Sequence, residues 1–194
     1  FVPHDVAGLV ELMGGNANFI AKLDELFATD SELTGDHVSN DISGLIGQYA
    51  HGNEPSHHIT HMYNVVGQPW KTQEMVDQIL STIYFNDPNG LAGNEDCGQM
   101  SAWYILNAMG FYSLCPGNPV YSLGRPIFDE VSIALPGGKA FEISVTNNAP
   151  ENKYIQSARL NGEPLAGPFF SHNQLMSGGT LEIELGGQPN KDLF

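Results

Sequence analysis

The sequence predicts an α+β protein in which helices come first and a β-rich segment follows. From residue 5 to about residue 113, apolar residues recur at the spacing of one helix face. After residue 116 they alternate with polar residues, as in a half-buried strand. Apolar residues make up 41% of the 194 residues, enough for a buried core. We therefore expect a helical part over residues 1–115 and a β-rich part over residues 116–194.

Five helices are expected in the first part. Two apolar stripes separated by Gly14-Gly15 predict the first two helices: Val6, Leu9, Val10 and Met13, then Phe19, Ile20, Leu23, Leu26 and Phe27. A third helix is expected from the Pro55-Ser56 start to Gly67, a fourth over residues 70–85 and a fifth over residues 96–109. The fifth begins with a D-x-x-Q pattern, Asp96 to Gln99, that matches a capping box.

Three segments of the second part alternate like strands: residues 131–135, 141–145 and 181–185. A Pro136-Gly137-Gly138 turn separates the first two. Asn161-Gly162 is typical of a tight hairpin.

Composition excludes several classes of partner. Seven Lys and Arg against 22 Asp and Glu give a net charge of −15, which repels nucleic acid and anionic membrane surfaces. No apolar run approaches the roughly 20 residues that a membrane helix needs.

Cys97 and Cys115 are too few for a disulfide scaffold; one bridge is possible, but two free buried thiols are expected.

The first polar loop precedes the third helix and reads HGNEPSHH at residues 51–58. Asn53 and Glu54 offer the hard oxygen atoms that Ca²⁺ prefers, although Glu54 could also serve only as a helix cap. His57 and His61 share a helix face, which raises a zinc site as an alternative. The Glu of an HExxH motif is replaced by His58, so core or substrate-facing histidines are expected instead.

The second polar loop precedes the fifth helix and contains Asn94, Glu95 and Asp96. Gly90 and Gly93 allow its backbone to turn sharply. A carboxylate near the positive end of a helix stays ionised and can accept a proton from water. From the residues alone, a catalytic base and a simple cap are equally good readings of Asp96.

Three long motifs give this sequence a specific resemblance. HGNEPSHH at 51–58, GQPWKT at 67–72 and GNEDCGQMSAWY at 93–104 resemble signatures of glycoside hydrolase family 92, the calcium-dependent exo-acting α-mannosidases. FVPHDV at 1–6, GFY at 110–112 and CPG at 115–117 look like that family too. The resemblance runs almost the whole length of the chain.

The resemblance implies an inverting hydrolysis of terminal α-linked mannose, with an acid acting on the leaving oxygen and a base acting on water. By match to the family's acidic loop, Asp96 would be the general base and Asn94 a supporting residue that cannot itself titrate. Asn53 and Glu54 would lie at the Ca²⁺, which binds sugar hydroxyls. His57, His58 and Glu95 are the candidates for substrate binding.

The resemblance also implies that the chain is incomplete. The family's general acid lies in a segment shortly before FVPH, where this sequence begins. The chain would then hold the last helices of an (α/α)6 toroid and the C-terminal β elements. Without the acid it would be inactive alone, and it would need the upstream half of the same polypeptide or associate with itself.

Two further expectations concern function and location. The same loops would also suit a non-catalytic module that binds carbohydrate and calcium, which is the alternative to a mannosidase. The mannose-containing glycan substrate and the habit of the family indicate an extracytoplasmic protein, periplasmic or secreted.

Overall fold

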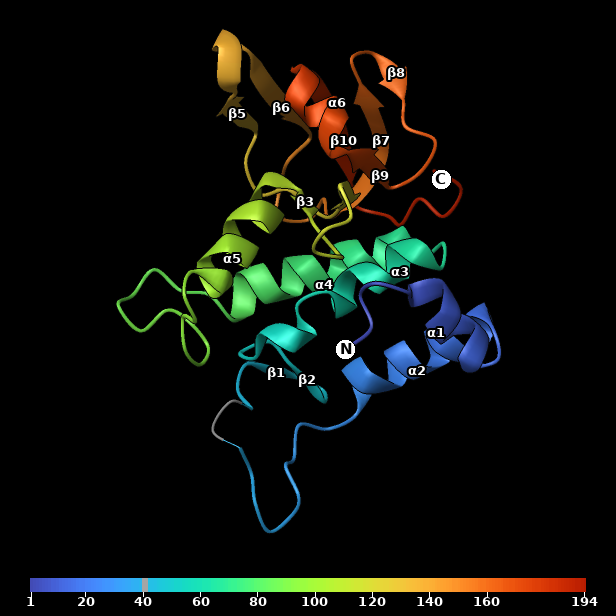
Figure 1. The fold of residues 1–194 in the computed structure, drawn as a ribbon, viewed down its shortest axis with the longest axis vertical. Coiled ribbons are helices and arrows are strands. Elements are labelled where there is room, and N and C mark those ends of the chain that lie inside the picture. The colour runs from blue at the N-terminus through green and yellow to red at the C-terminus, as the bar shows by residue number, and fades with distance from the viewer. Residues whose placement is uncertain (40–41) are drawn as a thin grey trace.

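The computed structural model describes residues 1–39 and 42–194. Helices α1 to α5 lie toward one end of the molecule, and the larger sheet lies at the other end together with the short helix α6, as Figure 1 shows. The main helices are α1 (Val6–Leu12), α2 (Asn16–Ala28), α3 (Met62–Val65), α4 (Pro69–Thr82), α5 (Gln99–Met109) and α6 (His172–Ser177). The predicted α+β class is thus confirmed, with helices preceding most strands. The division at residue 115 stays a prediction.

The first two helices form where the apolar stripes predict them. The Asp5 carboxylate caps α1 by accepting a hydrogen bond from the Gly8 N–H at 2.9 Å. Gly14 and Gly15 both have positive φ, so the chain reverses between the two helices. The inward residues pack with the α3 region in one cluster: Val6, Val10, Phe19, Leu23, Met62, Tyr63 and Val66.

The third predicted helix is only partly helical, which corrects the prediction. Two 3₁₀ turns, Glu54–Ser56 and Ile59–His61, precede a short α3. Such turns are tighter than an α-helix and reorient side chains within a few residues. The polar segment 51–58 is therefore a compact turn and not the first half of a regular helix, while the fourth helix forms as predicted.

The β part contains two sheets with separate strand orders. The five-stranded sheet has the order β5-β6-β10-β7-β8, and the three-stranded sheet has the order β3-β4-β9. Their strands are β3 (Phe111–Tyr112), β4 (Val120–Leu123), β5 (Glu130–Ala134), β6 (Ala140–Thr146), β7 (Tyr154–Leu160), β8 (Glu163–Pro164), β9 (Phe169–Ser171) and β10 (Gly179–Gly186). All three predicted strands are present, and Asn161-Gly162 forms the predicted hairpin, in which Leu160 pairs with Glu163.

Helix α4 joins the helical part to the five-stranded sheet. The Gln73 side chain accepts a hydrogen bond from the Ile155 N–H at 3.0 Å. One turn later along α4, Asp77 pairs with Lys153 at 3.0 Å and with Arg125 at 3.5 Å. These polar contacts hold α4 against β7 of the sheet and against the segments next to it.

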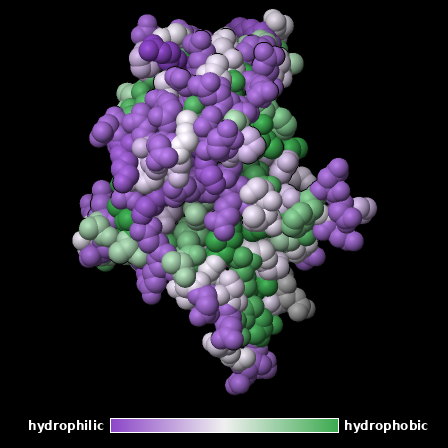
Figure 2. All heavy atoms as spheres, turned by 180° about the vertical axis from the view of Figure 1, so that it is seen from behind, coloured by the Kyte–Doolittle hydropathy of each residue, from purple (hydrophilic) through white to green (hydrophobic). Residues whose placement is uncertain are grey.

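The helical end leaves several apolar side chains exposed. Seen from behind in Figure 2, polar residues cover much of the upper part, whereas hydrophobic residues gather lower down. Leu12 is 88% exposed, Phe85 63% and Ile105 54%. In the described residues, no helix has both the length and the apolar character needed to cross a membrane.

Both cysteines are free thiols, as expected, but neither is buried as predicted, since Cys97 is exposed and Cys115 is half-buried.

Candidate active site

The two polar loops predicted from the sequence lie against each other. A short hairpin of β1 (Leu45–Ile46) and β2 (Tyr49–Ala50) leads into the first loop. A Cβ added to Gly52 would lie 3.0 Å from the Ala92 carbonyl oxygen, and one added to Gly93 would lie 2.9 Å from the Gly52 carbonyl oxygen. The two loop backbones therefore come into close contact at these glycines. A side chain at either position would push the loops apart.

Glu95, and not Asp96, caps α5, so the predicted capping box is wrong. The Glu95 carboxylate accepts hydrogen bonds from the backbone N–H groups of Gly98 and Ser101. The helix begins at Gln99, and Gly98 before it has a left-handed conformation. Asp96 is thus free of the capping role that its spacing suggested.

The backbone at Asp96 is unusual. Asp96 has a φ of 51° and Cys97 a φ of 57°, a left-handed conformation that residues other than glycine adopt at a cost of about 1–3 kcal/mol each. Together with Gly98 they form a run of three residues with positive φ immediately before the helix. Asp96 is exposed, so solvent reaches its carboxylate.

Asp96 meets Glu54 of the first loop. The Glu54 side chain lies next to the Asp96 side chain, and this contact is the main reason that the pKa of Asp96 is raised from its usual value. The two loops therefore bring two acidic side chains together.

An open depression of about 570 Å³ lies beside this pair. It is lined by side chains from the first loop, α5 and β3, including Glu54, His57, His58, Gln99 and Tyr112. A depression of this volume falls in the range of small-molecule sites. Glu54 is the residue that joins the acid pair to it.

His57 is buried and held in one tautomer. Its Nε2–H donates to the His51 carbonyl at 3.0 Å, so its Nδ1 must be an acceptor, here from the Gln99 amide at 3.0 Å. Burial lowers the pKa of His57, and burial also lowers the pKa of His58 to about 4. Both rings are therefore neutral near pH 7.

A buried hydrogen-bond chain supports the first loop from below. The Tyr84 hydroxyl donates to the Met100 carbonyl, so it must accept from His51 Nε2–H, at 2.7 Å. His51 Nδ1 then accepts from the Tyr49 hydroxyl at 2.9 Å. Burial, and to a lesser extent the nearby His57, lowers the pKa of His51 to about 3. The His51 ring in this series of hydrogen bonds is therefore neutral near pH 7.

The alternative of a zinc site at His57 and His61 finds no support in this geometry. His61 is fully buried, and its two nitrogens bond Ser122 and Asn107. Anywhere in residues 1–39 and 42–194, no three His, Cys, Asp or Glu side chains are grouped as a metal site.

The same loops offer oxygen atoms to a calcium ion. Glu54 and Asp96 place two hard carboxylates in contact, and a cation would relieve their mutual repulsion. Asn53, half-buried next to Glu54, adds oxygen atoms. Because Ca²⁺ takes 6–8 oxygen ligands, the donor set fits calcium only if further oxygens come from backbone, water, substrate or other protein.

The remaining predicted residues lie around this pair. Asn94 is exposed two residues before Asp96 in the second loop, and Glu95 is partly buried as the cap of α5. Sequence reasoning missed Gln99 and Tyr112, which line the depression. Gln99 had been assigned to the capping box, and Tyr112 was noticed only as part of the GFY motif.

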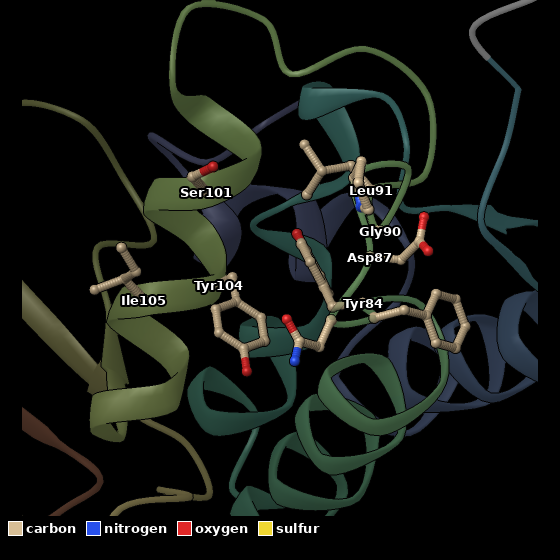
Figure 3. A pocket seen from close by; sticks show the side chains of 10 residues that line it. Tyr84, Asp87, Gly90, Leu91, Ser101, Tyr104 and Ile105 are labelled. Atoms are coloured by element: carbon tan, nitrogen blue, oxygen red, sulfur yellow. The ribbon is translucent and has the colours of Figure 1, made fainter.

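A second depression, of about 560 Å³, lies on the outer side of α5 (Figure 3). Its lining includes Tyr104 and Ile105 of α5 together with Tyr84 and Leu91, and the Tyr104 ring lies on the side of α5 toward Tyr84. The Tyr84 and Tyr104 rings lie 4.9 Å apart, and the Asp87 carboxylate is bonded to the Asn89 N–H. This depression lacks a pair of acids and is not the candidate active site.

Known proteins resemble this chain in sequence and in fold. A model described as the glycosyl hydrolase family 92 catalytic domain matches residues 1–187. The chain belongs to family 92 of the glycoside hydrolases. The resemblance inferred from the three loop motifs is thus confirmed.

Members of family 92 with solved structures share this fold. An α-mannosidase of Bacteroides thetaiotaomicron, BT3965, in complex with mannoimidazole is 37% identical, with a TM-score of 0.92 over 100% of this chain and 25% of its own. The inverting mannosidase BT2199 from the same organism is 39% identical, with a TM-score of 0.85 over 99% of this chain and 27% of its own.

A curated relative comes from the fungus Arthroderma benhamiae. It is described as an uncharacterized secreted glycosidase and is 34% identical over 189 residues, 96% of this chain and 22% of the relative. The chain therefore spans about a quarter of the length of its relatives.

Proposed function

We propose that the protein carrying this chain hydrolyses terminal α-linked mannose with inversion, and that Asp96 is the general base. The observation that carries the proposal is the exposed Asp96 carboxylate, paired with Glu54 at the edge of an open depression in a family 92 chain. The printed names of two relatives, a mannosidase and an inverting mannosidase, support the substrate and the stereochemistry.

Asp96 has the properties that the base role needs. Solvent access lets a water molecule reach the carboxylate, and a raised pKa makes the ionised form a stronger base. In an inverting enzyme this water attacks the anomeric carbon from the face opposite the leaving group, with the two carboxyl groups roughly 6.5–9.5 Å apart. Asn94 is assigned a supporting role, since its exposed amide can hold the same water.

The acid of the reaction is proposed to come from outside these 194 residues. The relatives are about four times as long, which leaves room for it. The exposed Leu12, Phe85 and Ile105 suit a surface that other parts of a longer polypeptide cover. On this proposal the 194-residue chain is inactive alone.

Asn53 and Glu54 are proposed as ligands of Ca²⁺, which when bound would supply a positive charge for sugar hydroxyls. Glu54 reaches both Asp96 and the depression, so it can connect the base with the sugar. His57 and His58 are proposed to contact the sugar as neutral rings, and Glu95 to contact it while it caps α5.

Location outside the cytoplasm is also proposed, with support from the secreted description of the fungal relative. A glycan is the expected partner, and the acidic composition argues against nucleic acid.

The proposal is tested by following hydrolysis of methyl α-mannoside by the full-length protein with proton NMR. The expected first product is β-mannose, which then mutarotates. First-formed α-mannose would overturn inversion, and sugar binding without turnover would favour the alternative of a carbohydrate-binding module.

A further inference from the structure

We infer that Gln99 and Tyr112 form a pair that binds two neighbouring hydroxyl groups of the sugar in the depression next to Glu54. The inference rests on the proposed function, because it names residues that would recognise the substrate of that site. It assigns them a contact role in place of the capping role that the sequence suggested for Gln99.

The hydrogen bonds of Gln99 determine the orientation of its side-chain amide. Since His57 Nε2–H is used on the His51 carbonyl, His57 Nδ1 accepts, and Gln99 Nε2 lies 3.0 Å from it. The same nitrogen lies 3.1 Å from the Tyr112 hydroxyl oxygen. Both amide hydrogens are therefore engaged, and exchanging the nitrogen and oxygen of the amide would lose the hydrogen bond to His57 Nδ1, which can only accept.

One acceptor and one donor remain for a ligand. In the part of the chain that the structure describes, Gln99 Oε1 has no hydrogen-bond partner and is not among the buried unpartnered atoms, so it faces solvent. The Tyr112 oxygen accepts from Gln99, which leaves the Tyr112 hydroxyl hydrogen free to donate. Both residues line the depression.

The chemistry of this pair matches a vicinal diol. Each sugar hydroxyl donates one hydrogen bond and accepts others, so adjacent hydroxyls can satisfy an acceptor and a donor that lie side by side. Burial raises the pKa of Tyr112, which keeps the phenol protonated and able to donate. Neutral partners of this kind suit a neutral sugar better than an ionic ligand.

The pair is held rigidly. The Tyr112 ring is 9% exposed and packs 5.5 Å from the His61 ring and 6.2 Å from the Trp103 ring, measured between centroids. Trp103 Nε1 also donates to the His57 carbonyl at 3.0 Å, which fixes the residue that Gln99 bonds. A preorganised site loses little conformational entropy when the sugar binds.

The test pairs each variant with a matched control in the full-length protein. Tyr112→Phe removes only the hydroxyl, and Tyr121→Phe removes a hydroxyl that bonds the exposed His172. Gln99→Met removes the amide, and Gln188→Met removes one from an exposed position. The substrates are 4-nitrophenyl α-mannoside and its four monodeoxy analogues.

Tyr112→Phe is expected to lower kcat/KM about 3–10-fold on the parent sugar, the effect of one neutral hydrogen bond. On the one analogue that lacks the contacted hydroxyl, it should change kcat/KM by less than about twofold. Gln99→Met should also lower kcat/KM on the parent sugar, and should change it by less than about twofold on the analogue that lacks the adjacent hydroxyl. The two control variants should leave kcat/KM unchanged. Equal losses on every analogue, or no loss on any, would overturn the inference.

A measurement of sugar binding separates failure of the proposed function from failure of this inference. If the wild-type protein does not turn over the substrates, calorimetry with methyl α-mannoside and its deoxy analogues tests the pair directly. A Kd about 3–10-fold higher for Tyr112→Phe on the parent sugar alone supports the pair. No binding by the wild-type protein, or the same Kd for both proteins, overturns it.

Discussion

Replacing His61 by Gln should remove part of the acid sensitivity of the folded protein. His61 lies between α5 and β4, where its Nε2–H donates to Asn107 Oδ1 at 2.9 Å and its Nδ1 accepts from the Ser122 hydroxyl at 3.0 Å. The Asn107 amide nitrogen is used on the Trp103 carbonyl, so this assignment of donors is fixed. Burial lowers the pKa of His61 to about 4.

The magnitude follows from the two pKa values. In the unfolded chain the His61 pKa is near 6.5, so below that pH the unfolded state takes up a proton that the folded state takes up only near pH 4. A lowered pKa of a base therefore contributes stability at neutral pH that is lost as the pH falls. Between pH 7.5 and 5.0 this amounts to about 2 kcal/mol in the free energy of unfolding.

Urea denaturation of wild type and His61→Gln at the two pH values measures this loss. The wild-type protein should lose about 2 kcal/mol more than the variant. His172→Gln, at an exposed histidine, should follow the wild type. Equal losses for wild type and His61→Gln would refute the reasoning, because they would show that His61 titrates normally when folded.

Three further predictions concern the cap of α5, the joint between the two parts and the cation. Glu95→Ala should lower the free energy of unfolding by about 1–2 kcal/mol through loss of the cap, whereas Glu95→Gln should lower it less; thermal denaturation compares the two. Asn64→Ala removes hydrogen bonds to the Ser122 hydroxyl and the Leu123 carbonyl, at 2.6 and 2.7 Å, and should cost about 2–3 kcal/mol, with the exposed Asn118→Ala as control. Chelation with EGTA should abolish mannoside hydrolysis and added Ca²⁺ should restore it; activity that survives chelation would contradict the calcium proposal.

The regular elements were predictable because their patterns are local. Apolar stripes found α1, α2, α4 and α5, and alternation found β5, β6 and β10. The short strands β3, β4 and β9 were missed, since two to four residues carry too little periodicity. The 3₁₀ turns before α3 were missed because helical spacing alone does not separate a regular helix from tight turns.

The candidate site was found in outline and not in detail. Gly93 was assigned to a turn, but its close approach to Gly52 joins loops about forty residues apart, which no local pattern reveals. Glu95 takes the capping role that the sequence suggested for Asp96, because Asp96, Cys97 and Gly98 all have positive φ. The D-x-x-Q spacing does not encode this backbone conformation. Gln99 and Tyr112 come from different elements that meet only after folding.

The rate of mannoside hydrolysis by Asp96→Asn in the full-length protein tests the central claim most directly. Amide and carboxylate have nearly the same shape, so the variant should fold and bind sugar, while kcat falls by about 10²–10⁴-fold. A variant that keeps more than about a tenth of the wild-type kcat would contradict the assignment of Asp96 as the base.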